Sequence, residues 1–165
     1  MLKKTILILG LFITLSPVMQ GQIKKKSDLF LQLKRMDSIV FNEGFNNCKL
    51  NELEKIIPED FEFYHDIGGN SGKNKFMADM KMNICSNPDK KPIRKLVVES
   101  LEVYPLYNNN ALYGAIQNGV HEFWIKEANK ELYKTGTAKF STTWILIDEK
   151  WLMKNVLSFD HKAAQ

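Results

Sequence analysis

The chain has 165 residues, of which 44% are hydrophobic and 25% are charged, and its net charge at neutral pH is +4. These values are ordinary for a soluble globular protein with one core, and the sequence contains no internal repeat or low-complexity segment. The charge is too small, and the lysines are too dispersed, for a nucleic-acid-binding protein.

The N-terminus has the pattern of a secretory signal. Two lysines precede an apolar run over residues 5–15, which is too short to span a bilayer comfortably, and Gly21 is a small residue suited to the position before a cleavage site. We therefore predict a signal peptide over residues 1–21 and a single domain over residues 22–165. This domain is expected to be periplasmic or secreted, with no membrane association once the signal is removed. An uncleaved membrane anchor is the alternative.

Two cysteines, Cys48 and Cys85, follow the predicted signal. In an exported protein an even number of cysteines favours a disulfide bond, and two buried free thiols are the alternative. Two cysteines without a CxxC motif do not indicate a zinc site.

The first predicted helix covers Ser27–Asn47. Ser27 is a suitable N-cap, and apolar residues recur at helical spacing along one face, namely Leu29, Leu33, Met36 and Val40. Asp37 lies at the edge of this apolar stripe, where it is either a solvated helix acid or an acid directed into a pocket.

Two shorter helices are predicted further along the chain. Asn51 and Glu54 resemble a capping box at the start of the first one, and Pro58 ends it. A glycine-rich loop over residues 68–72 leads into the second, which ends near Cys85. That loop lacks the known phosphate-binding patterns, so a nucleotide site is not indicated.

An aromatic strand over residues 61–66 lies between these two helices. Alternation places Phe61, Phe63 and His65 on one face and Asp66 on the other. We expect the face with two phenylalanines to be buried, and Asp66 therefore to point away from the core.

The remaining sequence has the pattern of long strands joined by short turns. We predict four strands, over Leu96–Tyr104, Leu112–Lys126, Leu132–Ile147 and Trp151–Phe159. Short turns make them antiparallel neighbours, and the glycines inside the second and third strands indicate strong curvature. The order of elements predicts an α+β fold in which N-terminal helices pack on a strongly curved, mainly antiparallel sheet.

Four segments carry a resemblance to a known superfamily: the hairpin from Trp144 to Trp151, and residues 61–66, 119–123 and 158–161. With the order of elements, they resemble the nuclear transport factor 2-like, or SnoaL-like, superfamily, and within it exported bacterial members. The resemblance implies a cone-shaped fold with a cavity between the helices and the concave face of the sheet, and frequent homodimers. It implies no single chemistry, because relatives include isomerases, dehydratases, cyclases, hydrolases and non-enzymatic binding domains.

The chain contains three histidines, His65, His121 and His161, each in or at the end of a predicted strand. Strict alternation allows all three to face the core. On the last strand it places His161 on one face with Trp151, Met153, Asn155, Leu157 and Phe159. The resemblance places the aromatic strand beside the last strand, which would bring His65 and His161 together.

Three interpretations of the histidines stay open. Three imidazoles could bind a transition metal, although their wide spacing matches no metal-binding motif. A histidine beside an aspartate suits acid/base catalysis, with His65, His161 and Asp37 as catalytic residues and Asp160 as a further acid. Alternatively, the histidines are the polar points of an apolar binding cavity. The sequence has no nucleophile elbow, and we assign no metal site and no cofactor.

We therefore expect an exported protein that binds a small, mostly apolar molecule in its cavity, with a homodimer as a further expectation. The predicted lining residues are Phe61, Phe63, His65, His121, Phe123, Asn155 and His161. The alternative is an acid/base enzyme of the isomerase, dehydratase or hydrolase type, with or without a histidine-bound metal. An interaction domain with a filled cavity is a third class.

Overall fold

The computed structural model describes residues 21–164, so the signal-peptide prediction lies outside the described part except for its last residue. From the N-terminus the helices are α1 (Asp28–Ser38), the π-helix η1 (Ile39–Asn46), α2 (Leu50–Glu54), α3 (Lys73–Asp79) and the π-helix η2 (Met80–Ile84). The strands are β1 (Glu62–His65), β2 (Gly69–Gly72), β3 (Lys90–Leu96), β4 (Glu102–Asn108), β5 (Ala111–Glu127), β6 (Tyr133–Ile147) and β7 (Lys150–Ala163). Over residues 21–164, no helix combines the length and apolar character that a membrane crossing requires.

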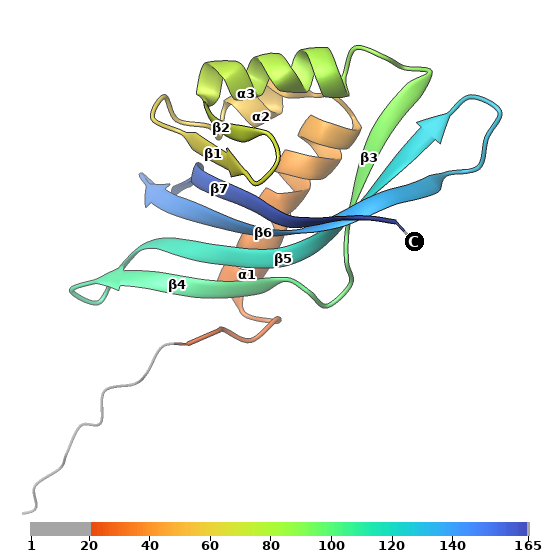
Figure 1. Cartoon of the computed structure of the whole chain (residues 1–165). Helices are drawn as coiled ribbons and strands as arrows, with labels where there is room; N and C mark the ends of the chain where they lie inside the picture. The colour runs from red at the N-terminus through yellow and green to blue at the C-terminus, as the bar shows by residue number, and fades with distance from the viewer. Residues whose placement is uncertain (1–20, 165) are drawn as a thin grey trace, which may run out of the picture.

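The strands form one curved sheet in the order β2-β1-β7-β6-β5-β3, and β4 also pairs with β5. Among the described strand pairs, β1 and β7 run parallel and the others run antiparallel. The helices gather on one side of the sheet, with α1 running across the strands (Figure 1). The predicted α+β fold, with N-terminal helices on a curved and mainly antiparallel sheet, is confirmed.

Helix α1 and its continuation η1 supply one side of the core. Ser27 Oγ accepts a hydrogen bond from the backbone N–H of Phe30 at 3.3 Å, as an N-cap does, and Phe30 and Leu33 are buried. Gln117 of β5 donates to the carbonyl oxygen of Leu33 at 2.9 Å, which ties the helix to the sheet. The first predicted helix is therefore present, with a change to π-helical hydrogen bonding where η1 begins.

Two predictions of element boundaries are wrong. Helix α2 begins at Leu50, so Asn51 lies inside its first turn rather than capping it. The strand predicted over Leu96–Tyr104 is two strands, β3 and β4, which pair with successive parts of β5. Between them Glu99 has a φ of 68°, and the apolar pattern of this segment does not reveal such a turn.

The first irregularity in β7 is a bulge at Lys154, which has no partner in the pairing of β7 with β6. Met153 is buried before the bulge, whereas Val156 and Ser158 are buried after it. The strict alternation predicted for this strand is therefore wrong beyond the bulge. Three residues that were expected to face inward lie on the outer side instead: Asn155, Leu157 and Phe159.

The second irregularity lies at Asp160, whose φ of 59° is in the left-handed region. Here Asp160 and His161 together lie opposite one residue of β6. This bulge returns His161 to the inner side, where its ring stacks on His65, with 4.2 Å between the ring centroids. The two bulges thus decide which side chains of β7 reach the interior.

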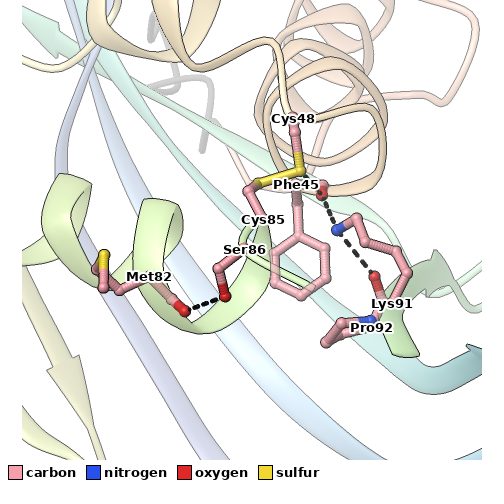
Figure 2. Close-up of a disulfide and its surroundings, with 7 residues drawn as sticks. All are labelled: Phe45, Cys48, Met82, Cys85, Ser86, Lys91 and Pro92. Carbon is pink, nitrogen blue, oxygen red and sulfur yellow. Dashed lines mark hydrogen bonds between the residues drawn. A yellow bond between two sulfur atoms is a disulfide. The ribbon is translucent and has the colours of Figure 1, made fainter. Parts of the chain in front are cut away.

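Cys48 and Cys85 form a disulfide, so the free-thiol alternative does not apply. The bond joins the chain just beyond η1 to the chain just beyond η2, as Figure 2 shows. At the same corner, Lys91 of β3 donates to the carbonyl oxygen of Phe45 at 2.7 Å (Figure 2). The disulfide and this hydrogen bond hold the two π-helical segments and β3 together.

We expect a variant in which both cysteines are replaced by serine to lose about 3–4 kcal/mol of unfolding free energy. The disulfide links residues 37 positions apart, and a closed loop of this length restricts the unfolded chain by that amount. Denaturant unfolding of the variant and the wild type measures the difference. A reductant should lower the wild-type midpoint to that of the variant and leave the variant unchanged. A loss below about 1 kcal/mol would contradict the prediction.

Candidate functional site

A cavity of about 480 Å³ lies between the helices and the sheet. Its walls are mostly apolar, and its volume is within the usual range of small-molecule pockets. Four of the predicted lining residues lie in its wall: Phe63, His65, His121 and Phe123.

The other three predicted lining residues lie elsewhere. Phe61 is 1% exposed and belongs to the core, where its ring contacts Phe76. Asn155 lies on the outer side of β7 and donates to a carboxylate oxygen of Glu62 at 2.9 Å. His161 lies in a shallower hollow that shares His65 with the cavity wall.

Two side chains in the cavity wall, those of Trp144 and Gln117, are hydrogen-bonded to each other. Trp144 Nε1 donates to the side-chain oxygen of Gln117 at 2.9 Å, while the Gln117 amide nitrogen donates to the backbone of α1. Both residues are buried. This network satisfies its polar atoms internally, so it shapes the wall rather than offering a contact to a ligand.

Asp37 forms a buried ion pair with Arg94 of β3. Two guanidinium nitrogens donate to its two carboxylate oxygens at 2.9 and 2.8 Å, and the guanidinium lies over the ring of Phe41 at 3.8 Å. Burial raises the pKa of Asp37 above its ordinary value, although the positive charge and hydrogen bonds of Arg94 oppose this shift. Asp37 therefore pairs with an arginine, where the sequence analysis expected it to serve the histidines.

Arg94 was not among the predicted site residues, although the sequence contains a signal for it. Arg94 lies two residues after Pro92 and two residues before Leu96, so on a strand it shares one face with these two apolar residues. An arginine on an apolar face predicts a buried partner of opposite charge.

His121 lies among three phenylalanine rings, those of Phe41, Phe123 and Phe140, with centroid distances from 4.8 to 5.7 Å. Its Nδ1 accepts a hydrogen bond from Nε of Arg94 at 3.4 Å, so the ring proton lies on Nε2. Burial, followed by the nearby positive charge of Arg94, lowers the pKa of His121 to about 3. His121 is therefore neutral at physiological pH and unsuited to act as a base.

His65 has a fixed tautomer. Its Nδ1 accepts hydrogen bonds from the backbone N–H groups of Ile67 at 3.1 Å and Gly68 at 3.0 Å, which places the ring proton on Nε2. Partial burial, followed by the charge of His161, lowers the pKa of His65, while Asp66 acts in the opposite direction. His65 is thus held neutral, with its protonated Nε2 in a ring that stacks on the ring of His161.

Asp66 is the acid that contacts a histidine. Its Oδ1 lies 2.5 Å from Nδ1 of His161, and its Oδ2 accepts the backbone N–H of His161 at 3.2 Å. Partial desolvation acts to raise the pKa of Asp66, but the hydrogen bonds and charge of His161 outweigh it and lower that pKa. The expectation that Asp66 points away from the site is wrong, because it lies in the turn after β1, where strand alternation no longer applies.

The arrangement of donors does not fit a metal ion. Potential ligand atoms of His65, Asp66 and His161 lie within 4.8 Å of one another. However, Nδ1 of His65 is occupied by two N–H donors, its Nε2 carries the proton, and Nδ1 of His161 is engaged by Asp66. His121 lies beside the positive charge of Arg94. A three-histidine centre would require these hydrogen bonds to be broken.

Ser158 is a further polar residue that the sequence analysis did not identify. It is buried, lines the cavity, and places its Oγ 3.4 Å from Nε2 of His161. Strand alternation separates residues three positions apart onto opposite faces, so a sequence pattern could not have joined Ser158 to His161. The bulge at Asp160 brings them together.

Comparisons with known proteins agree on the fold. No protein-family profile and no curated protein sequence matches the chain. Among solved structures, Aln2 from a Streptomyces species is similar with a TM-score of 0.65 and 8% identity, covering 79% of this chain and 89% of its own. An NTF-2 like protein of unknown function from Shewanella oneidensis has a TM-score of 0.55 and 18% identity, covering 81% of this chain and 98% of its own.

A third similar structure is a putative calcium/calmodulin dependent protein kinase II association domain from Xanthomonas campestris. Its TM-score is 0.57 and its identity 15%, and the match covers 84% of this chain and 92% of that one. These likenesses show that the chain has the nuclear transport factor 2-like fold. At such low identity they carry no activity to this chain.

We expect the unfolding free energy of the wild type to fall by about 2 kcal/mol more than that of His121→Gln between pH 7 and pH 5. Folded His121 stays neutral down to about pH 3, whereas the unfolded residue takes up a proton near its ordinary value of 6.5. The unfolded state thus binds more protons between these values, and stability is lost as the pH falls. Glutamine keeps an acceptor for Arg94 but does not titrate. Equal losses in denaturant titrations of both proteins would show that folded His121 takes up the proton too.

Proposed function

We propose that this protein is exported and binds a small, mostly apolar molecule in the cavity between its helices and its sheet. The observation that carries the proposal is the cavity itself, about 480 Å³ of space bounded mostly by apolar side chains. A packed interior has few voids larger than a water molecule, so an apolar space of this size supports a binding role over a merely structural one.

The polar groups at the cavity favour a ligand with one polar end. Gln117 and Asp37 are paired within the protein, whereas Nε2–H of His121 is buried without a partner among the described residues, and His65, Thr142 and Ser158 also lie in the wall. An apolar body in the cavity with a carbonyl or hydroxyl group directed at one of these histidine N–H groups would satisfy this pattern.

The disulfide supports export, because such bonds persist in oxidising compartments such as the periplasm or the exterior of the cell.

We also propose a homodimer through the outer face of β7. Leu157 and Phe159 are 43% and 39% exposed there, an apolar surface that a second copy would cover. Size determination of the wild type and of Leu157→Asp tests this assembly.

Acid/base catalysis is the second candidate function. It is favoured by one observation, the 2.5 Å contact between His161 Nδ1 and Asp66, because an aspartate orients a histidine base in this way. In this version the catalytic residues are His65 and His161, and Asp66 takes the place expected for Asp37. Deuterium uptake at the carbon next to a ketone carbonyl, lost in His161→Gln, would support it.

We expect Thr142→Phe to weaken binding of the uncharged fluorophore N-phenyl-1-naphthylamine at least tenfold. Thr142 is 4% exposed and lines the cavity, so a phenyl ring there occupies the space that an apolar ligand would take. Fluorescence titration measures the affinity, and native mass spectrometry of the purified protein shows whether a small molecule co-purifies.

Thr143→Phe is the matched control. Thr143 is the next residue of β6 and faces the other side of the sheet, so the same substitution leaves the cavity open. Thermal unfolding of both variants separates a filled cavity from a damaged fold. Equal affinities in the wild type and a folded Thr142→Phe would refute binding in the cavity.

A further inference from the structure

Ser158, His161 and Asp66 form a continuous chain of contacts that begins at the cavity wall with Ser158. Ser158 Oγ lies 3.4 Å from Nε2 of His161, and Nδ1 of the same ring lies 2.5 Å from the Asp66 carboxylate. The carboxylate also holds the backbone N–H of His161 at 3.2 Å, so both the position and the tautomer of the ring are fixed. A hydroxyl, a histidine and an orienting carboxylate in this order define an activated nucleophile.

The backbone is distorted at the point where this chain of contacts forms. On a regular strand, residues three positions apart face opposite sides, so Ser158 and His161 could not meet. They meet because Asp160 between them adopts a φ of 59°, a conformation that costs a non-glycine residue about 1 kcal/mol. Bulges of this kind re-aim side chains beside functional sites.

Ser158 and His161 lie where two hollows meet. Ser158 lines the apolar cavity, whereas His161 lines a shallower and more open hollow, and both spaces share His65 and Phe123 in their walls. An apolar group bound in the cavity would therefore end at the Ser158 hydroxyl. A second, more polar group and water can occupy the outer hollow.

His65 supplies the donor that such a nucleophile needs. Its Nδ1 accepts two backbone N–H groups, so its proton lies on Nε2, and its ring stacks on His161 with 4.2 Å between centroids. An N–H group fixed beside the base can stabilise the negative oxygen that forms when a carbonyl group is attacked.

We propose that Ser158, His161 and Asp66 act as a catalytic triad that hydrolyses carboxylic esters with an apolar acyl group. The proposal rests on the proposed function, because the acyl group would occupy the apolar cavity. An ester is the substrate class, because its alcohol leaving group needs less assistance than the amine of an amide.

In the first step Ser158 Oγ forms a bond to the carbonyl carbon and its proton moves to Nε2 of His161. The negative oxygen of the tetrahedral intermediate accepts a hydrogen bond from Nε2–H of His65. When the carbon–oxygen bond to the alcohol breaks, His161 returns the proton to the leaving oxygen. Water then repeats the sequence on the acyl-serine ester, releasing the carboxylic acid and restoring Ser158. Asp66 acts as a positioning residue through His161.

The test uses protein purified after expression of the full chain and an alkyl fluorophosphonate, which forms a stable adduct with activated serines. We expect intact-mass and peptide analysis to find one adduct on Ser158. Labelling should fall at least a hundredfold in Ser158→Ala and His161→Gln. Saturation of the cavity with N-phenyl-1-naphthylamine should slow labelling. Hydrolysis of p-nitrophenyl hexanoate should show the same dependence on Ser158.

Ser141→Ala is the matched control, because Ser141 lies on the neighbouring strand β6, opposite the outward-facing Leu157. It should label at the wild-type rate. Asp66→Asn should slow labelling about tenfold or more, and Asp66→Glu should restore part of the rate while thermal stability stays equal. His65→Phe, which keeps the ring stack but removes the donor, should lower ester hydrolysis at least tenfold.

The outcomes separate the two proposals. If the fluorophore binds but the wild type labels no faster than Ser158→Ala, the triad is refuted and the binding function stands. Labelling that is equally fast in His161→Gln also refutes the triad. Labelling of Ser158 without fluorophore binding would support the nucleophile and overturn the apolar cavity as its acyl site.

Discussion

The interior of this protein depends on how strand β7 bends against β6. The bulge at Lys154 turns Val156 and Ser158 toward the cavity, and the bulge at Asp160 turns His161 back to the same side. A regular strand would keep His161 on the inner face with Met153 but would turn Val156 and Ser158 outward, so that Ser158 and His161 could not meet. Curvature of the sheet and placement of the candidate site therefore have one origin, because each bulge both bends the strand and re-aims a side chain.

The buried pair of Asp37 and Arg94 constrains the other end of the cavity. Two charges in an apolar interior are tolerated because both guanidinium–carboxylate hydrogen bonds are made and the guanidinium lies over Phe41. Burial, and after it the positive charge of Arg94, lowers the pKa of His121 and keeps that histidine neutral. The two ends of the cavity consequently differ in chemistry. At the His121 end the charged groups pair with each other, although Nε2–H of His121 has no partner among the described residues, and the His65 end adjoins the hollow that His161 lines.

The features that depend on local sequence pattern could be predicted, whereas those that depend on how neighbouring strands pair could not. The helix capped by Ser27, the inward face of the aromatic strand and the α+β class follow from periodicity and propensity, and the structure has them. The neighbourhood of His65 and His161 followed from the resemblance to a known fold rather than from spacing. The partner acid could not be deduced, because Asp66 lies in a turn whose direction depends on hydrogen bonds to β7, including its own N–H to the carbonyl oxygen of Ser158 at 3.1 Å. A single residue without a pairing partner reverses every later prediction along a strand, and its position is set by the neighbouring strand rather than by the residue itself.

Gly119 shows again that the structural role of a residue depends on how its strand pairs with the neighbouring strand. Gly119 was predicted to indicate strong curvature of the sheet. Its structural role is to let another side chain approach the backbone closely. A Cβ atom there would lie 2.6 Å from the ring of Phe140, the residue that pairs with it on β6. The space left by the missing side chain lets the Phe140 ring lie against the sheet, where it stacks on His121 with 5.0 Å between centroids. The aromatic rings that enclose His121 and keep it buried and neutral thus depend on a glycine two residues before it. The inner surface of the cavity is therefore determined both by the side chains that line it and by the positions where a side chain or a strand partner is absent.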